Sequence, residues 1–190
     1  MRIIFLDVDG VLNNDKTEDR IFGWIGIDPK LLNNLKRLYD ESNKEEETRI
    51  VVSSSWKNDE VRSKNGYTKA DNCYAELLKR LNSLNMEVLG YTTETRSQSE
   101  RGEGILRWIK EYNGEHEQPI STYVVLDDEE FDFENHEDLY KRFVHTSRFF
   151  DKEEVKNQWW SYVAEGLIDK HVEKALKILR GEFGENVGES

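Results

Sequence analysis

The stretch that most constrains the fold lies at the start of the chain, where an apolar run at residues 3–6 is followed at once by Asp7, Val8, Asp9 and Gly10. A short apolar run without alternation predicts a strand that is buried on both faces, as in a parallel sheet. Ligands of open α/β sheets bind outside the carboxyl ends of the strands. The two carboxylates therefore predict a functional site at this strand end, and Gly10 lets the chain turn after them.

Two later stretches repeat the pattern of a buried strand that ends in polar residues. Residues 49–52 and 123–126 are short runs rich in Val, Ile and Leu, and they predict two more buried strands. The polar residues that follow them are Ser53 and Ser54 after the first, and Asp127 and Asp128 after the second. Further strands are expected at 86–89 and 142–145. The chain thus predicts several functional side chains at one sheet edge.

Helical patterns lie between these strands. Asp28 and Pro29 are typical of an N-cap followed by proline at the first helical position. Residues 41–47 are expected to form a charged, solvated connection after that helix, and residues 13–27 a glycine-containing hairpin or flap. Apolar residues at helical spacing predict further helices over 74–84, 105–112 and 172–179.

The alternation of strands and helices predicts an α/β fold with a central parallel sheet in three layers, covered by helices on both faces. We expect residues 1–190 to form a single domain, because no repeat or linker interrupts them. The aromatic-rich stretch at about 147–165 is harder to place. It is expected to be an extra helical excursion packed on the domain, or a partly exposed aromatic surface.

Composition excludes several classes of protein. The single cysteine, Cys73, leaves no disulfide framework and no Cys-rich zinc site. The net charge of −12 argues against general affinity for the nucleic-acid backbone. No apolar stretch approaches the roughly 18 residues of a membrane span, and the start of the chain lacks the pattern of a signal peptide. A soluble, cytoplasmic protein is expected.

Carboxylates gathered at one sheet edge repel one another, and a divalent cation removes this difficulty. Oxygen-only ligands favour Mg²⁺ and leave coordination positions for water and a substrate phosphate. A serine hydroxyl from Ser53 and a guanidinium could hold the phosphoryl oxygens. Arg101, near the start of the predicted 105–112 helix, is the candidate cation, and Arg96 in the same loop competes with it.

Each of these motifs has a plainer explanation. A calcium loop with its invariant glycine at Gly10 would begin at Phe5 and end at Lys16, and neither can serve as the required acid. A serine run alone is more often a strand end that bonds its own turn. Arg101 could equally be a solvated residue at a helix start. Asp127 and Asp128 could belong to the acidic run that continues to residue 134. The histidines show no ligand spacing and are expected at the surface or at edges: His116, His136, His145 and His171.

Taken together and in this order, the motifs resemble the haloacid dehalogenase (HAD) superfamily, and most closely the HAD domain of Swiss-Army-Knife RNA-repair proteins. The segments that carry the resemblance are 5–13, 53–56, 101–103, 108–109 and 124–128. The similarity extends from residue 1 to about 146 and resumes at 166–167. The first motif is specific in its context, whereas the serine motif alone would be weak.

The resemblance implies a Mg²⁺-dependent phosphohydrolase that works through an aspartyl-phosphate. Asp7 would be the nucleophile, and Asp9 would act as general acid and then general base. The substrate phosphate would be held by Ser53, with Ser54 beside it, and by Arg101. The metal ligands would be Asp7, the backbone carbonyl of Asp9 and Asp127, with Asp128 in support.

The spacing of the motifs also bears on the substrate. Between Asp7 and Ser53 there is room for a flap and a helix but for no large cap domain, and the loop at 57–69 is short. A capless site would be open to a phosphorylated small molecule, a nucleotide, a phosphoprotein or a nucleic-acid end. Two rival functions are a catalytically silent HAD-like binding module and a receiver-like phosphoacceptor. A receiver would stop at the aspartyl-phosphate, because it lacks the second acid.

Overall fold

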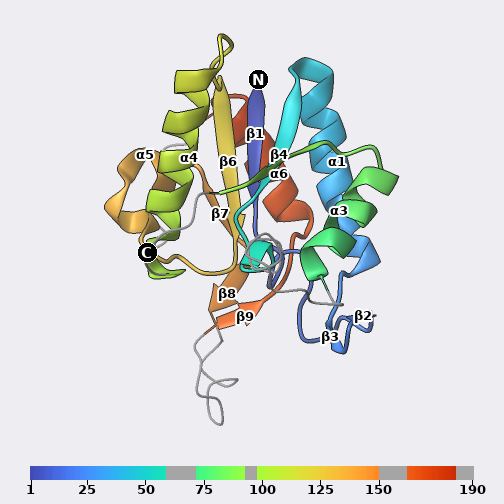
Figure 1. Cartoon of the computed structure of the whole chain (residues 1–190). Coiled ribbons are helices and arrows are strands. Elements are labelled where there is room, and N and C mark those ends of the chain that lie inside the picture. Colours follow the sequence, from blue (N-terminus) through green and yellow to red (C-terminus); the bar gives the residue numbers. More distant parts are fainter. Residues whose placement is uncertain (59–71, 93–97, 150–161, 183–190) are drawn as a thin grey trace.

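The chain folds around one parallel sheet, as Figure 1 shows for this computed structural model, which describes residues 1–58, 72–92, 98–149 and 162–182. The strand order is β5-β4-β1-β6-β7. The strands are β1 (Arg2–Leu6), β4 (Thr48–Val52), β5 (Val88–Tyr91), β6 (Thr122–Asp127) and β7 (Phe143–His145). β1 is the central strand and pairs in parallel with both β4 and β6. The predicted central parallel sheet is confirmed.

Helices cover both faces of the sheet, because side chains of a strand alternate between its two faces. Ile4 and Leu6 of β1 belong to one buried cluster, whereas Ile3 and Phe5 belong to another. The helices on the first face are α1 (Pro29–Glu45), α3 (Cys73–Ser83) and α6 (Asp169–Leu179). On the second face lie α4 (Arg101–Glu115), the 3₁₀ turn η2 (Phe133–Asn135) and α5 (Glu137–Tyr140). The three-layer α/β prediction is confirmed.

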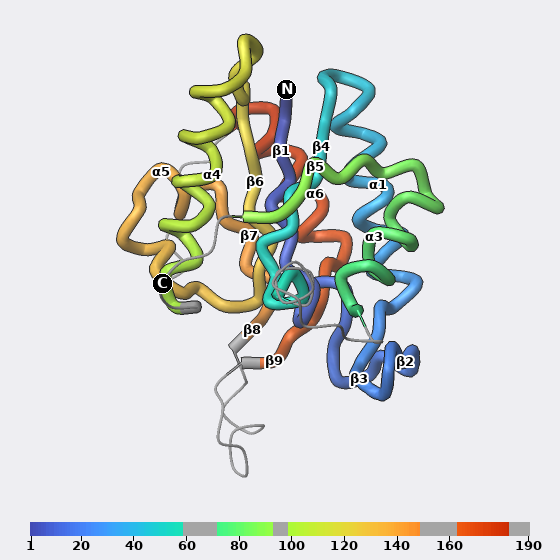
Figure 2. The backbone as a smooth tube through the Cα atoms, viewed as in Figure 1, coloured from blue at the N-terminus to red at the C-terminus, as the bar shows by residue number. Residues whose placement is uncertain are grey.

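Two small hairpins extend from the sheet, and Figure 2 places both at the end opposite to the N-terminus. β2 (Arg20–Ile21) and β3 (Trp24–Ile25) form the flap expected within residues 13–27. β8 (Ser147–Phe149) pairs with β9 (Tyr162–Ala164) in antiparallel orientation. The described ends of the 147–165 stretch are therefore strands, which contradicts a helix there, whereas the alternative of a partly exposed aromatic surface stays a prediction. Its residues 150–161, with Trp159 and Trp160, lie outside the described residues.

Helix α1 begins where the sequence predicted and ends later. The side chain of Asp28 accepts hydrogen bonds from the backbone N–H groups of Lys30 and Leu31, so the predicted N-cap is confirmed. The helix continues to Glu45, so residues 41–45 are helical and are not the expected connection, although most of the 41–47 run is exposed as expected. Ser42 is fully buried there, and Lys and Glu are good helix formers. The strand expected at 86–89 also lies two residues later, at β5.

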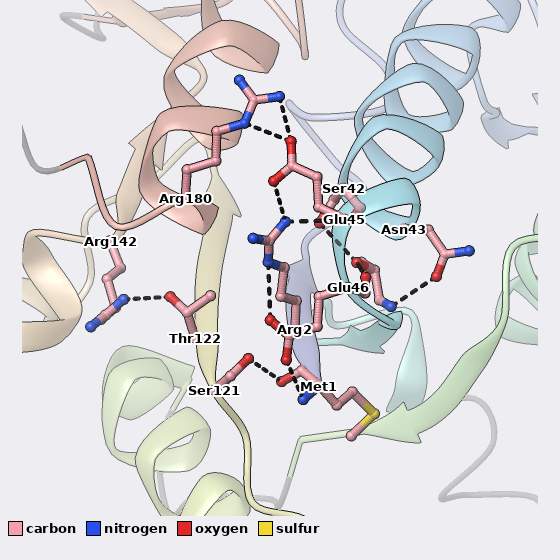
Figure 3. A network of polar contacts seen from close by, with 11 residues as sticks. Met1, Arg2, Ser42, Asn43, Glu45, Glu46, Ser121, Thr122, Arg142 and Arg180 are labelled. Atoms are coloured by element: carbon pink, nitrogen blue, oxygen red, sulfur yellow. Dashed lines mark hydrogen bonds and ion pairs between the residues drawn. The ribbon is translucent and has the colours of Figure 1, made fainter.

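The acidic end of α1 has a structural role at the amino edge of the sheet (Figure 3). The N-terminal ammonium of Met1 lies 2.7 Å from a carboxylate oxygen of Glu46. Glu45 pairs with Arg2 at 3.0 Å and with Arg180 at 2.8 Å. These pairs join the start of β1 to the ends of α1 and α6. Because they are partly exposed, each is expected to add little to stability.

A search of the described ranges for a membrane-spanning helix, one both long and apolar enough to cross a bilayer, finds none.

Candidate active site

Three of the predicted site residues lie at one level of the sheet because of its register. Leu6 at the end of β1 pairs with Val52 in β4 and with Leu126 in β6. The residues that follow them are Asp7, Ser53 and Asp127. The Ser53 N–H donates to the Leu6 carbonyl at 2.8 Å, and the Asp7 N–H donates to the Leu126 carbonyl at 3.0 Å. Since the strand order reverses at β1, this edge is the topological switch point where such folds bind ligands.

The alternation of side chains along β1 brings Asp7 to the face that α4 covers. Asp7 follows Ile3 and Phe5 at intervals of two residues, and these belong to the cluster that α4 closes. Arg101 is the first residue of α4. Its Nη1 atom lies 2.7 Å from Asp7 Oδ2 and 2.5 Å from Asp127 Oδ2. One nitrogen of the guanidinium thus bridges two buried carboxylates that are 120 positions apart in the sequence.

A third carboxylate completes an acidic group. Asp7, Asp127 and Asp128 each offer an oxygen, and these oxygens all lie within 4.8 Å of one another. Asp7 and Asp127 are buried, and Asp128 is half-buried. A small set of carboxylate oxygens at this spacing suits a hard divalent cation such as Mg²⁺. The donors present therefore fit the metal that the sequence predicted.

The electrostatics of this group also favour a cation. Burial and the neighbouring Asp7 raise the pKa of Asp127 well above its ordinary value, although Arg101 opposes this. Burial, with Asp7 and Glu129, raises the pKa of Asp128 to about 7. Burial opposes the charge of Arg101, but the two carboxylates outweigh it and raise the pKa of Arg101. The arginine stays charged, yet one cation does not balance three carboxylates.

The two serines at the end of β4 differ in their bonding. Ser53 Oγ is buried and has no hydrogen-bond partner within the described residues. Ser54 Oγ accepts the backbone N–H of Trp56 at 3.3 Å and so bonds its own turn. An unpaired buried hydroxyl costs about 1–3 kcal/mol. A ligand oxygen beside Ser53 would remove that cost.

Asp9 lies apart from the acidic group. It is exposed, its Oδ1 accepts a hydrogen bond from Asn13 Nδ2 at 2.9 Å, and its Oδ2 accepts one from the indole N–H of Trp56 at 3.0 Å. The turn after it depends on Gly10, which has a φ of +70°, and an added Cβ there would lie 2.2 Å from the carboxylate of Asp128. The predicted role of Gly10 is confirmed.

The start of α4, which carries Arg101, is held by a distant carboxylate. Asp132 accepts the backbone N–H of Gly102 at 2.6 Å and that of Glu103 at 3.1 Å. A side chain at Gly102 would meet Asp132 and His136 at 3.0 Å, so glycine permits this close approach. The guanidinium of Arg101 lies 4.1 Å from the centre of the Phe131 ring. Its competitor Arg96 lies outside the described residues.

Sequence reasoning missed the side chains that support the site. Asn13 and Trp56 stood within the motif segments but received no role. Asp132 gave no local signal, because its contacts depend on the tertiary fold. His145 donates from Nε2 to the backbone carbonyl of Asp128 at 2.8 Å. The prediction that every histidine lies at the surface or at an edge is wrong for His171, which is buried on the inner face of α6.

A comparison with protein families gives a match to the HAD domain in Swiss Army Knife RNA repair proteins, over residues 3–153. The chain belongs to this HAD family. No curated protein and no solved structure shows significant similarity to the chain. The matched part of the chain contains the acidic group and both serines, and it ends before α6. The observed α/β architecture agrees with a HAD domain, and the family supports a phosphohydrolase at a coarse level.

Proposed function

We propose that this HAD domain is a Mg²⁺-dependent phosphohydrolase that cleaves phosphate monoesters through an aspartyl-phosphate on Asp7. The observation that carries the proposal is the level placement of Asp7 between Ser53 and Asp127. Asp7 and Asp127 are buried carboxylates, and Ser53 supplies a buried hydroxyl that has no partner in the described part of the chain. These are the parts that a site needs to hold a phosphoryl group and a cation next to a nucleophile.

In the first step, a carboxylate oxygen of Asp7 forms a bond to phosphorus, and the bond from phosphorus to the leaving oxygen breaks. Asp9 gives its proton to that oxygen. In the second step, Asp9 takes a proton from water, and the water oxygen displaces Asp7 from phosphorus. Proton balance is restored, and the products are an alcohol and inorganic phosphate.

The remaining residues position the phosphoryl group. Ser53 would donate its hydroxyl hydrogen to a phosphoryl oxygen, with Ser54 holding the turn behind it. Arg101 would neutralise phosphoryl charge while it stays bonded to Asp7. Mg²⁺, when bound, would supply further charge neutralisation and orientation. The proposed holders of the metal are Asp7, the Asp9 carbonyl, Asp127 and, in support, Asp128.

Substrates that bring their own bulk fit the open site best. In the described part of the chain, only the β2–β3 hairpin and α1 lie between β1 and β4, in agreement with a capless enzyme. We therefore include a phosphorylated small molecule and a nucleic-acid end among the candidate substrates. The family description names RNA repair proteins. The net charge of −12 still weighs against affinity for long nucleic acids.

The test is a phosphatase assay on the purified chain with and without Mg²⁺. The substrates are an aryl phosphate, nucleotides, sugar phosphates, and oligonucleotides with a 3′- or 5′-phosphate. Asp7→Asn is expected to lower Mg²⁺-dependent turnover by about three orders of magnitude or more while the fold persists, because the nucleophile is lost. Asp15→Asn, at an exposed acid of the same loop, is the matched control and should keep full activity.

The possible results separate the rival functions. Unchanged turnover in Asp7→Asn would contradict the nucleophile assignment. Phosphate that remains on the protein without turnover would favour the receiver-like phosphoacceptor. A wild-type chain that is folded, and neither hydrolyses any substrate nor becomes phosphorylated, would favour the silent binding module.

A further inference from the structure

The Asp9 carboxylate is unusually restrained for an exposed group on a turn. Both of its oxygens accept a hydrogen bond, one from Asn13 at 2.9 Å and one from Trp56 at 3.0 Å. The two donors come from different segments, because Trp56 is 47 positions away in the sequence. An exposed carboxylate ordinarily samples several rotamers. Here its direction is set by two neutral N–H donors.

Asn13 is itself held firmly. It is buried, with 3% of its surface exposed, and all three of its contacts are short. Its Nδ2 donates to Asp9 and also to the backbone carbonyl of Gly26 at 3.0 Å, while its Oδ1 accepts the backbone N–H of Gly10 at 3.0 Å. The same amide therefore fixes the turn after Asp9, the end of the β2–β3 hairpin and the carboxylate.

Trp56 ties the same carboxylate to the phosphate side of the site. The residue is 8% exposed and packs in the apolar cluster on the α1 face, so the indole cannot move freely. Its N–H points out of that cluster to Asp9. Ser53 lies only three residues before it, at the end of β4. The indole thus links the Asp9 carboxylate to the segment that carries the proposed phosphate-binding hydroxyl.

We propose that Asn13 and Trp56 are positioning residues that aim the Asp9 carboxylate for proton transfer, an inference that rests on the proposed function. The arrangement is compatible with that chemistry. A carboxylate oxygen that accepts one hydrogen bond keeps a second lone pair, which can carry the transferred proton. Because both donors are neutral, they orient the group without adding a charge beside it.

The leaving group distinguishes a positioning role from simple packing. An alkoxide needs a proton as it departs, whereas a nitrophenolate departs readily without one. Trp56→Phe removes the indole N–H and keeps an aromatic ring. We expect it to lower kcat/KM, which reports the steps up to departure of the leaving group, about ten-fold for an alkyl phosphate, part of the usual contribution of general acid catalysis, and about two-fold for p-nitrophenyl phosphate.

Asn13→Asp provides a second and independent variant. It keeps the shape of the side chain and an oxygen for the Gly10 N–H, but a second carboxylate replaces the group that donates to Asp9 and to the Gly26 carbonyl. The same selective loss is expected. Trp108→Phe is the matched control, because Trp108 packs edge-on against Phe5 in the other cluster. Thermal unfolding of each variant checks that the fold persists.

A double substitution tests whether the effect passes through Asp9. In an Asp9→Ala background, Trp56→Phe should have no further effect on either ester, because the group it orients is gone. Equal losses of kcat/KM for both esters, or a full additional loss in that background, would overturn the positioning role. A wild-type chain without Mg²⁺-dependent hydrolysis would instead overturn the proposed function and this inference with it.

Discussion

At the scale of single residues, the clearest sign of a ligand is the hydroxyl of Ser53, which has no partner among the residues that the structure describes. A polar atom that is buried without a hydrogen-bond partner lowers stability. The neighbouring Ser54 hydroxyl has such a partner, the backbone N–H of Trp56, so this strand end can provide one. The contrast assigns the two serines different jobs. Ser54 bonds its own turn, and we propose that Ser53 binds a substrate.

The contrast predicts that alanine at Ser53 and alanine at Ser54 have opposite effects on stability and on activity. Ser53→Ala is expected to leave the free energy of unfolding unchanged or to raise it by about 1 kcal/mol, because it removes an unsatisfied group. It should also lower kcat about a hundred-fold, as loss of one donor to a transition-state oxygen does. Urea unfolding and steady-state kinetics measure the two effects.

Ser54→Ala is the matched control and should show the reverse. Losing the hydrogen bond to Trp56 should cost about 1 kcal/mol of stability, with activity retained within a few-fold. A Ser53→Ala protein that is less stable and fully active would contradict the assignment.

The sequence allowed the placement of the main candidate residues at one sheet edge to be predicted, because it depends on local patterns. Asp7, Ser53 and Asp127 each come directly after a strand, and strands of a parallel sheet share an edge. The supporting contacts could not be predicted in this way. The indole of Trp56 reaches Asp9 only because β4 lies beside β1, and apolar periodicity does not reveal which side chains meet.

At the scale of secondary structure, the start of α4 determines where Arg101 lies. The N-cap residue, Glu100, makes no capping hydrogen bond with its side chain. Asp132 supplies the cap instead, from the loop before η2. A carboxylate there also interacts favourably with the helix dipole. The helix and the loop that follows Asp128 are therefore fixed together.

Asp132→Ala is expected to destabilise the protein by about 1–2 kcal/mol, because two N–H groups at the start of α4 lose their acceptor. Arg101 should then be held less firmly, and we expect a several-fold fall in kcat/KM. Glu134→Ala, at an exposed acid of η2, is the control and should change neither quantity. Denaturant unfolding and kinetics provide the measurements. Full stability in Asp132→Ala would refute the capping role.

Helices and strands were predicted well in type and less well at their ends. The periodic apolar residues of α1 and α6 were sufficient to predict both helices. The end of α1 was missed because its charged residues were interpreted as a loop, although Lys and Glu also favour helices. In addition, Ser42 is buried and hydrogen-bonded to Thr48, which the local sequence does not indicate. β5 was displaced because Gly90 and a register irregularity against β4 alter the pairing.

At the scale of the whole molecule, the C-terminal helix is fastened to the loop that carries the site. The Leu167 N–H donates to the carbonyl of Val11 at 2.8 Å, and Asn14 Nδ2 donates to that of Glu165 at 3.1 Å. Helix α6 lies beyond the family match, yet its inner face belongs to the same buried cluster as β1. We therefore propose that residues 1–190 form one folding unit.

His171 makes the stability of that unit depend on pH. Burial lowers the pKa of His171, although the carbonyl of Gly166 and the carboxylate of Glu165, 3.8 Å away, oppose the shift. The unfolded chain therefore takes up a proton at a higher pH than the folded chain does. The contribution is fully present above the ordinary pKa of 6.5 and is lost as the pH falls through the lowered pKa.

We expect the free energy of unfolding to fall more steeply between about pH 7 and pH 5 in the wild type than in His171→Gln. Glutamine cannot take up a proton in this range, so the comparison isolates the histidine. Urea unfolding at several pH values measures both slopes. Parallel slopes would show that His171 does not titrate differently in the folded and unfolded chains.

Asp7, Ser53 and Asp127 lie side by side at the ends of neighbouring strands, and this arrangement has a consequence for the evolution of such proteins. Backbone bonds between strands set this arrangement, such as the one from the Ser53 N–H to the Leu6 carbonyl. The side chains of the three residues are not needed to hold it. Each position can therefore mutate alone without displacing the other two. Descendants of one ancestor can lose turnover, or acquire a different chemistry, while the sheet stays intact.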